Sequence, residues 1–121
     1  ETIYNMADVL IDGKPPVIFG TGRHTRDYVF ITDVVDANVK AAENGASGIF
    51  NIGRGIEINV HDVFDVVTKA FGDRALPAES APEVPEVDRI ALDSTKARTE
   101  LGWEPSVDFE TGVMETIRSY Q

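Results

Sequence analysis

The sequence contains no cysteine, and this absence excludes several kinds of chemistry at once. Without thiols the chain has no disulfide, no cysteine nucleophile and no cysteine-ligated zinc, so it tolerates a reducing compartment. No apolar run approaches the roughly 20 residues needed to cross a bilayer, and no basic segment followed by an apolar one stands at the beginning. The sequence therefore predicts a cytoplasmic protein that is neither membrane-bound nor exported.

Basic residues are also scarce, since 11 lysines and arginines face 21 acidic residues and the net charge is -10. Such a charge repels phosphate backbones and anionic lipids at long range, so we expect no nucleic-acid or membrane partner. A small phosphorylated ligand is still compatible with this negative net charge. Two or three local arginines can dominate a site within a Debye length of roughly 8 Å.

Candidate catalytic groups are few. His24 and His61 are too isolated for a metal site or a nucleophile triad, and we predict surface or loop positions for both. A tyrosine acid/base is commonly assisted by a lysine four residues further on, but Tyr4, Tyr28 and Tyr120 all lack that lysine. The sequence thus predicts no catalytic residue and no metal site.

A nicotinamide cofactor needs a glycine-rich turn between a strand and a helix, where backbone donors face the pyrophosphate. Gly53-Arg54-Gly55 comes nearest to such a turn. The third glycine of the fingerprint would fall on Ile58, so the segment is interpreted as an ordinary turn. We expect no cofactor-binding residue in this chain.

Length and periodicity predict one folded domain of 121 residues. Apolar residues at helical spacing from Ile3 predict a helix that ends near Asp12, before Gly13 and two prolines. Residues 17–19 are wholly apolar and precede a glycine turn, which favours a buried strand.

Residues 28–31 and 49–52 are predicted as a second and a third strand. Between them we expect a helix that Asp33 caps and that buries a face formed by Val35, Val39 and Ala42. An Asn59–Asp62 capping box predicts the next helix, with an apolar face at positions 60, 63, 64, 67 and 71.

The stretch 73–89 contains three prolines, at positions 77, 82 and 85, and is predicted to be a loop or lid. Short helices are expected over 94–101, ending at Gly102, and after Asp108. Strands alternating with helices indicate an α/β fold with a small, mainly parallel sheet and about five helices. The thin sheet and the initial Glu1 predict a portion of a longer protein.

Two arginines, Arg23 and Arg26, follow the glycine turn, where a planar guanidinium can grip a diphosphate. Surface ion pairs with Asp27 or Asp33 explain them equally well. Asp33 and Asp36 resemble a magnesium site, but a helix cap and its first turn explain them more simply.

Three motifs carry a family resemblance: PPVIFGTGRHTRDYVFITDVVDAN at 15–38, GIFNIGRG at 48–55 and DRIALDSTKARTELGWEP at 88–105. In this order and spacing they resemble the extended short-chain dehydrogenase/reductases, the NAD-dependent epimerase/dehydratase family. The resemblance is greatest to the C-terminal part of the UDP-glucose 4-epimerase group. It implies that residues 1–121 are the C-terminal, nucleotide-sugar-binding portion of an extended Rossmann-type enzyme, and that the N-terminal NAD-binding domain is absent from this chain.

The resemblance also implies a substrate site. The strand Val17, Ile18 and Phe19 would lie against the uracil ring, Arg26 would bind the diphosphate, and Tyr28 would lie beside it. The chemistry of these residues supports the same roles, because an apolar strand can cover a flat base while a guanidinium neutralises the charge of a phosphate.

One departure from the family pattern concerns an Arg-Pro-Gly-Asp run, which aligns with positions 83–86 of this chain. Glu83 replaces the phosphate-binding arginine and would repel phosphate, whereas Glu86 can still accept a ribose hydroxyl. Arg89 is a candidate to compensate for the lost charge.

Full-length members of the family oxidise the sugar at C4 with bound NAD and return the hydride to the other face. The resemblance therefore implies a part of a UDP-sugar epimerase of galactose metabolism, inactive by itself. A nucleotide-sugar dehydratase or decarboxylase, and a stand-alone or truncated binding module, remain alternatives. The base (uracil, thymine or guanine) and the sugar stay open, and exposed sheet edges favour a homodimer.

Overall fold

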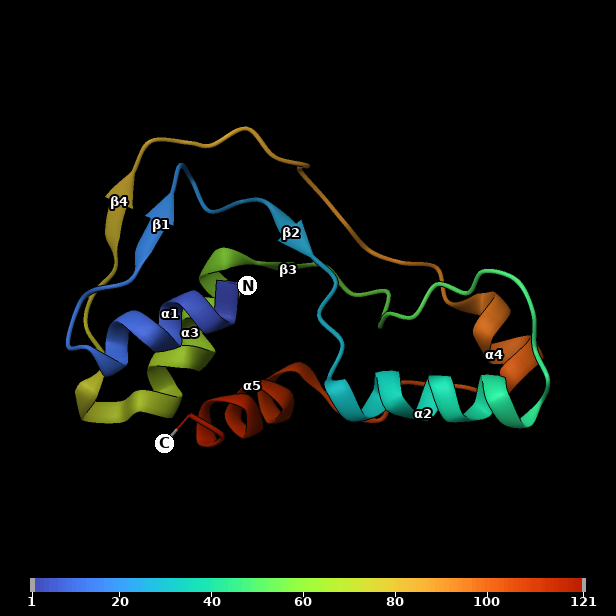
Figure 1. Cartoon of the computed structure of the whole chain (residues 1–121). Helices are drawn as coiled ribbons and strands as arrows, with labels where there is room; N and C mark the ends of the chain where they lie inside the picture. The colour runs from blue at the N-terminus through green and yellow to red at the C-terminus, as the bar shows by residue number, and fades with distance from the viewer. Residues whose placement is uncertain (1, 121) are drawn as a thin grey trace.

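The computed structural model describes residues 2–120, which form two lobes (Figure 1). The larger lobe contains the helices α1 (Thr2–Ile11), α3 (Val60–Phe71) and α5 (Phe109–Arg118), the strands β1 (Val17–Phe19) and β4 (Glu79–Ala81), and the 3-10 helix η1 (Gly72–Arg74). The smaller lobe contains α2 (Ile31–Glu43) and α4 (Thr95–Leu101), and the strands β2 (Thr25–Arg26) and β3 (Ile58–Asn59) lie towards the junction. The predicted α/β fold with about five helices is confirmed.

The strands form two small sheets. β1 pairs in parallel with β4, with Val17 opposite Glu79 and Phe19 opposite Ala81, whereas β2 and β3 are antiparallel. The parallel β1–β4 pair agrees with the expected sheet type. Parallel strands need a long crossover connection, and the helices between β1 and β4 in the sequence supply it. β4 lies inside the stretch predicted to be a loop, so that prediction is partly wrong. Its sequence is polar and carries no strand signal.

The core of the larger lobe is formed by the apolar faces of α1, α3 and α5. The capping box at the start of α3 is confirmed: the Asn59 side chain accepts from the Asp62 amide at 2.9 Å, and the Asp62 carboxylate accepts from the Asn59 amide at 3.1 Å. Asp108 caps α5 by accepting from the Thr111 amide at 2.8 Å. The buried residues of this core are Met6, Ala7, Leu10, Val63, Val67, Phe71, Val113 and Ile117.

Asp33 organises the smaller lobe in a way that the sequence did not predict. α2 begins at Ile31 with Phe30 at its N-cap, so the prediction that Asp33 caps the helix is wrong. The buried Asp33 carboxylate instead accepts from the Ser106 and Val107 amides at 3.0 and 3.1 Å, and its backbone oxygen accepts from the Trp103 indole at 2.8 Å. These contacts fix the segment before α5 against α2.

Two predicted strands, 28–31 and 49–52, are absent from the described part of the chain. Ile31 starts α2 instead, and no regular structure is formed at 49–52. A strand needs a neighbouring strand for its backbone hydrogen bonds, and neither small sheet extends to these runs.

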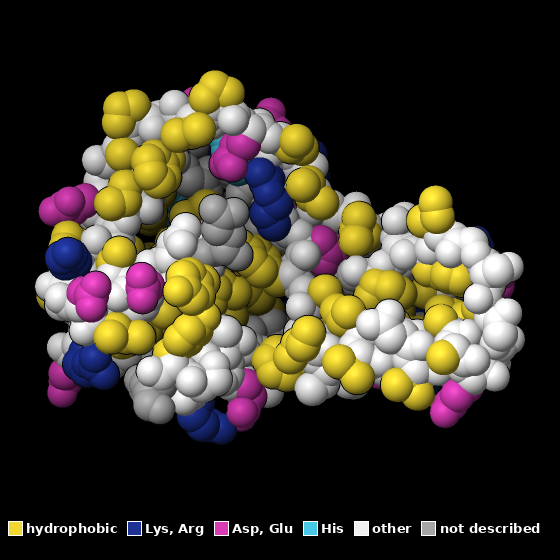
Figure 2. Space-filling model, in the orientation of Figure 1, with side chains coloured by type: hydrophobic (Ala, Val, Ile, Leu, Met, Phe, Trp, Pro, Cys, Tyr) yellow, Lys and Arg dark blue, Asp and Glu magenta, His cyan; other side chains and the backbone are white. Residues whose placement is uncertain are grey.

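The predicted buried face of α2 is also wrong. Val35 is 51% and Val39 47% exposed, and the helix buries Asp33 and Ala37 instead. Ile49, in the connection after α2, is 86% exposed. Figure 2 shows hydrophobic side chains over the surface of the smaller lobe. None of the helices within residues 2–120 is long and apolar enough to cross a membrane.

Candidate functional site

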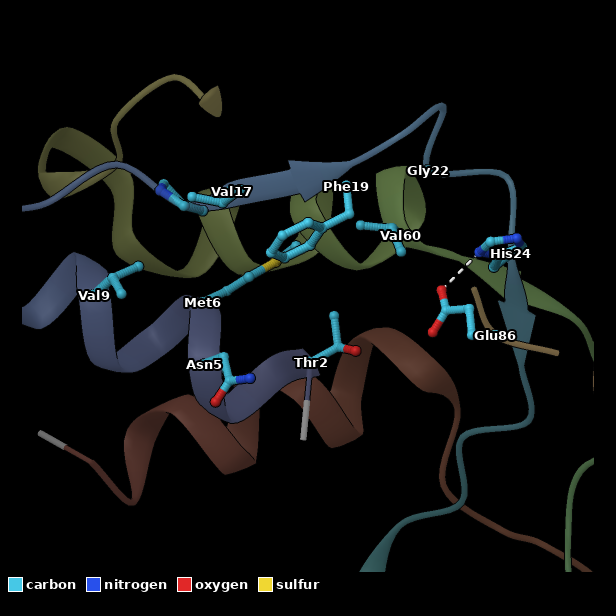
Figure 3. A pocket seen from close by; sticks show the side chains of 11 residues that line it. Thr2, Asn5, Met6, Val9, Val17, Phe19, Gly22, His24, Val60 and Glu86 are labelled. Carbon is cyan, nitrogen blue, oxygen red and sulfur yellow. Dashed lines mark hydrogen bonds and ion pairs between the residues drawn. The ribbon is translucent and has the colours of Figure 1, made fainter. Parts of the chain in front are cut away.

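A pocket of about 220 Å³ opens between β1 and α1. Val17 and Phe19 project from β1 towards α1, where Met6 and Val9 lie opposite them (Figure 3). His24 and Glu86 close the end of the pocket that lies beyond Phe19. Its walls are Thr2, Asn5, Met6, Val9, Pro16, Val17, Phe19, Gly22, His24, Val60 and Glu86. The pocket is thus apolar along the strand and charged at one end.

Only part of the β1 strand faces this pocket, because successive side chains of a strand point to opposite sides. Val17 is 41% and Phe19 52% exposed, whereas Ile18 is buried. The prediction of a wholly buried strand is therefore wrong. Ile18 does not line the pocket, so the structure brings two of the three predicted base-contacting residues to it.

The charged end is built from the two segments that leave the carboxyl ends of β1 and β4, residues 20–26 and 82–90. The Thr25 amide donates to the Asp88 carbonyl at 2.8 Å, and the Ile90 amide donates to the Thr25 carbonyl at 3.2 Å. These bonds hold the two segments side by side. In parallel sheets, ligands bind outside the carboxyl ends of the strands, which is where these segments lie.

Arg26 does not line the pocket itself, but it is bonded to Glu86, which does. Its Nη1 donates to the carbonyls of Thr25 at 2.6 Å and Val87 at 2.7 Å, and its Nη2 lies 3.2 Å from Glu86 Oε2. The ion pair that the sequence left open therefore exists, but its partner is Glu86 and not Asp27 or Asp33. A guanidinium in this position can exchange the carboxylate for a phosphate of similar geometry.

His24 is the residue of this site that the sequence analysis missed. It lies in the loop before β2, which agrees with the predicted surface or loop position, but it is buried there, with 9% of its surface exposed. Its Nδ1 lies 2.6 Å from Glu86 Oε1, and its Nε2 lies 3.0 Å from Asp88 and 3.6 Å from Glu83. Those partners are about 60 residues away in the sequence, and no local pattern signals such a contact.

Two other predicted site residues lie outside the pocket. Arg89 makes two hydrogen bonds to Glu57, from Nε at 2.7 Å and Nη2 at 2.6 Å. Hydrogen bonds from Arg89 and then Thr25 lower the pKa of Glu57 to about 2, and the same pairing raises the pKa of Arg89. Tyr28 packs against Phe109, with ring centroids 5.4 Å apart.

The glycine turn at 53–55 is closed by a carboxylate of this chain. Asp27 accepts from the amides of Arg54, Gly55 and Leu92, each at 2.9 Å. The backbone donors that a pyrophosphate would need are therefore already used. A Cβ at Gly53 would lie 2.7 Å from the Asp27 carboxylate, which explains the glycine. The residues of this turn do not fit a dinucleotide cofactor.

No group of three histidine or acidic side chains suited to a metal ion is present among the described residues. The magnesium interpretation of Asp33 and Asp36 fails for Asp33, whose oxygens are taken by Ser106 and Val107. Burial alone would raise the pKa of Asp33, but the hydrogen bonds from Ser106 and Val107 outweigh it and lower the pKa below its ordinary value.

Comparison with known proteins gives a consistent result. The family model described as GDP-mannose 4,6 dehydratase matches residues 1–116. UDP-glucose 4-epimerase of Mycolicibacterium smegmatis is 36% identical over 116 residues, which cover 95% of this chain and 37% of the relative.

Solved structures of similar proteins agree with the sequence matches. UDP-glucose 4-epimerase of Thermotoga maritima with UDP-glucose has a TM-score of 0.90 at 35% identity and covers 99% of this chain and 39% of its own. The Thermus thermophilus UDP-glucose 4-epimerase complex with NAD has a TM-score of 0.88 at 28% identity and covers 98% and 39%. The chain spans little more than a third of the length of these relatives.

Proposed function

Because the chain belongs to the extended short-chain dehydrogenase/reductase family, in its NAD-dependent epimerase/dehydratase group, we propose that it is the nucleotide-sugar-binding portion of an epimerase resembling UDP-glucose 4-epimerase. In this proposal residues 1–121 are the C-terminal part of the enzyme, and a separate NAD-binding Rossmann domain carries the cofactor and the catalytic residues. The full-length enzyme would oxidise the sugar at C4 and reduce it again from the other face.

The observation that carries the proposal is the position of Val17 and Phe19 on the open face of β1. Two large apolar side chains that are about half exposed have no role in the core, and together they offer a flat surface to a base. Stacking of a base on an aromatic ring contributes about 1–3 kcal/mol. Ile18, which points the other way, supports the strand from behind.

The diphosphate would bind next to this apolar surface, at Arg26. The guanidinium is fixed by two carbonyl oxygens and paired to a carboxylate that an incoming phosphate can replace. In this proposal Glu86, which lines the pocket, accepts a ribose hydroxyl. Arg89 is engaged with Glu57 and Tyr28 with Phe109, so in this proposal they support the site without contacting the ligand.

The pocket also has the size expected of an incomplete site. Its volume of about 220 Å³ is below the roughly 300–1,000 Å³ of small-molecule pockets. The glycine turn is closed by Asp27, so NAD and the reacting sugar carbons would be held by the portion of the enzyme outside this chain. One solved relative is a complex with NAD, which supports NAD as the cofactor of the parent enzyme.

Two alternatives use the same residues. The matching family model is described as a dehydratase, and a dehydratase or decarboxylase would share this nucleotide-binding half. A binding module without redox chemistry is favoured by Glu83, which lies 3.6 Å from His24 and would repel a phosphate.

Binding is tested by calorimetry of the chain with UDP-glucose. We expect Arg26→Gln to weaken binding about tenfold or more and Phe19→Ser to weaken it about fivefold or more, because each removes a direct contact. Arg118→Gln is a matched control, since Arg118 pairs with Glu115 on α5, away from the pocket. Equal affinity of the Arg26 variant and the control would contradict the proposed diphosphate contact.

The enzyme proposal is tested separately, by joining this chain to the part of the Mycolicibacterium smegmatis relative that it does not match. Conversion of UDP-glucose to its C4 epimer by the chimera would support an epimerase. Formation of a dehydrated sugar would favour the dehydratase. A folded chimera that binds UDP-glucose and NAD but converts no nucleotide sugar would favour the binding module.

A further inference from the structure

His24 and Glu86 form the wall between two depressions of the surface. Both line the pocket beside β1, and both line a second, more open depression of about 280 Å³. The other walls of that depression come from the segments 20–26 and 82–90, namely Arg23, Glu83, Val84, Pro85 and Asp88. A change at His24 therefore acts on both depressions.

His24 lies between two carboxylates. One ring nitrogen lies 2.6 Å from Glu86 and the other 3.0 Å from Asp88. An ionised carboxylate only accepts hydrogen bonds, so both contacts are hydrogen bonds at once only when both ring nitrogens carry a proton. Histidine side chains commonly change charge between pH 5 and 8, so a series of pH values tests the role of this charge.

The protonation of His24 sets the net charge of the cluster. Two arginines stand against three carboxylates, so the cluster carries a charge of -1 when His24 is neutral and 0 when it is protonated. Glu83 stands where the family pattern has a phosphate-binding arginine, which increases the effect of this one proton. The charged groups around His24 are Arg23, Arg26, Glu83, Glu86 and Asp88.

We propose, building on the proposed function, that His24 is a positioning residue of the diphosphate site: in its charged form it holds Glu86 and frees Arg26 for phosphate. Glu86 is shared between the His24 ring and the Arg26 guanidinium. When His24 loses its proton, the Arg26 guanidinium alone neutralises the charge of Glu86. The same guanidinium then binds a phosphate less strongly. Nucleotide-sugar binding is therefore stronger at pH 5.5 than at pH 8.

The pH dependence of binding tests this inference. UDP-glucose is the suitable probe because neither of its two phosphates is terminal, whereas a terminal phosphate changes charge near pH 6. The affinity of the wild-type chain for UDP-glucose is expected to fall about threefold to tenfold from pH 5.5 to pH 8, the effect of one nearby charge. Uridine, which has no phosphate, should bind with the same affinity at both pH values.

Variants separate the two histidines of the chain. His24→Gln is expected to give a flat pH profile for UDP-glucose, with an affinity near the wild-type value at pH 8. His61→Gln is the control, because the His61 ring is exposed and its nitrogen lies 2.7 Å from the Thr21 carbonyl and not beside a carboxylate within the described residues, and it should keep the wild-type profile. A flat wild-type profile, or a pH dependence that survives in His24→Gln, would overturn the inference while leaving the proposed function intact.

The His24 ring can also be followed directly by NMR. Glu86→Gln should shift the signals of the His24 ring in the absence of ligand, because it replaces the carboxylate that lies 2.6 Å from Nδ1, and unchanged ring signals would overturn the His24–Glu86 contact. If the wild-type chain binds neither UDP-glucose nor uridine, the proposed function fails, and the Glu86 variant still decides the contact.

Discussion

Replacing Asp33 by alanine is expected to destabilise the chain by about 2–4 kcal/mol. Asp33 is 2% exposed and its carboxylate accepts three hydrogen bonds, two from the Ser106 backbone and hydroxyl and one from the Val107 amide. A hydrogen bond to a charged group contributes about 1.5–3 kcal/mol. The three do not add fully, because they share one carboxylate and water can reach the exposed Ser106.

Urea unfolding followed by the fluorescence of Trp103 measures this change. Trp103 is the single tryptophan of the chain, is fully buried and donates to the backbone of Asp33. Asp36→Ala is the matched control, since Asp36 lies on the same helix and pairs with Lys40, a contact worth about 0.5 kcal/mol or less. Equal losses of stability in the two variants would show that the Asp33 hydrogen bonds do not hold the segment before α5.

The stability difference between the wild-type chain and Asp33→Ala also depends on pH. The pKa of Asp33 is lowered in the folded chain from an ordinary value of 3.8, so its contribution is fully present above that value. It is lost as the pH falls through the lower, folded pKa. The stability difference between wild type and Asp33→Ala should therefore be constant above about pH 5 and shrink below pH 3.8. A difference that is unchanged at pH 2 would contradict this assignment.

Three further predictions concern the core, an ion pair and the exposed face of the smaller lobe. Leu10→Ala should cost about 2–5 kcal/mol in urea unfolding, whereas Val35→Ala should stay within about 0.5 kcal/mol, because only Leu10 is buried. Arg89→Gln should raise the pKa of Glu57 from about 2 towards its ordinary 4.5, which carboxyl NMR would detect; an unchanged pKa would contradict the pairing. The contribution of the Glu57–Arg89 pair to stability is lost as the pH falls from 4.5 towards 2. Ile49→Lys should reduce self-association in sedimentation if the exposed apolar side chains bring two chains together, and a wild-type monomer at high concentration would contradict a homodimer.

Local features of the structure were predictable from the sequence because their causes are local. The Asn59–Asp62 capping box lies within four residues, and it starts α3 at the predicted position. Gly102 ends α4 with a φ of 66°, a conformation that favours glycine. The apolar face predicted for α3 also contributes its buried residues Val63, Val67 and Phe71 to the core.

Long-range contacts account for the errors. Asp33 was interpreted as a cap because an aspartate near the start of a helix commonly is one, but its partners lie more than 70 residues away. The runs 28–31 and 49–52 have strand composition, yet the described residues offer them no neighbouring strand. At the site, the apolar strand and Arg26 came from the resemblance, whereas the His24–Glu86 contact depends on the folded arrangement of two distant segments.

The central claim is that Val17, Phe19 and Arg26 together bind a nucleotide diphosphate. The most direct test is an amide-resolved NMR titration of the chain with UDP. We expect saturable shifts at β1 and in the segments 20–26 and 82–90, with none at the far end of α2. A well-dispersed spectrum that does not respond to UDP, or shifts confined to the smaller lobe, would contradict it.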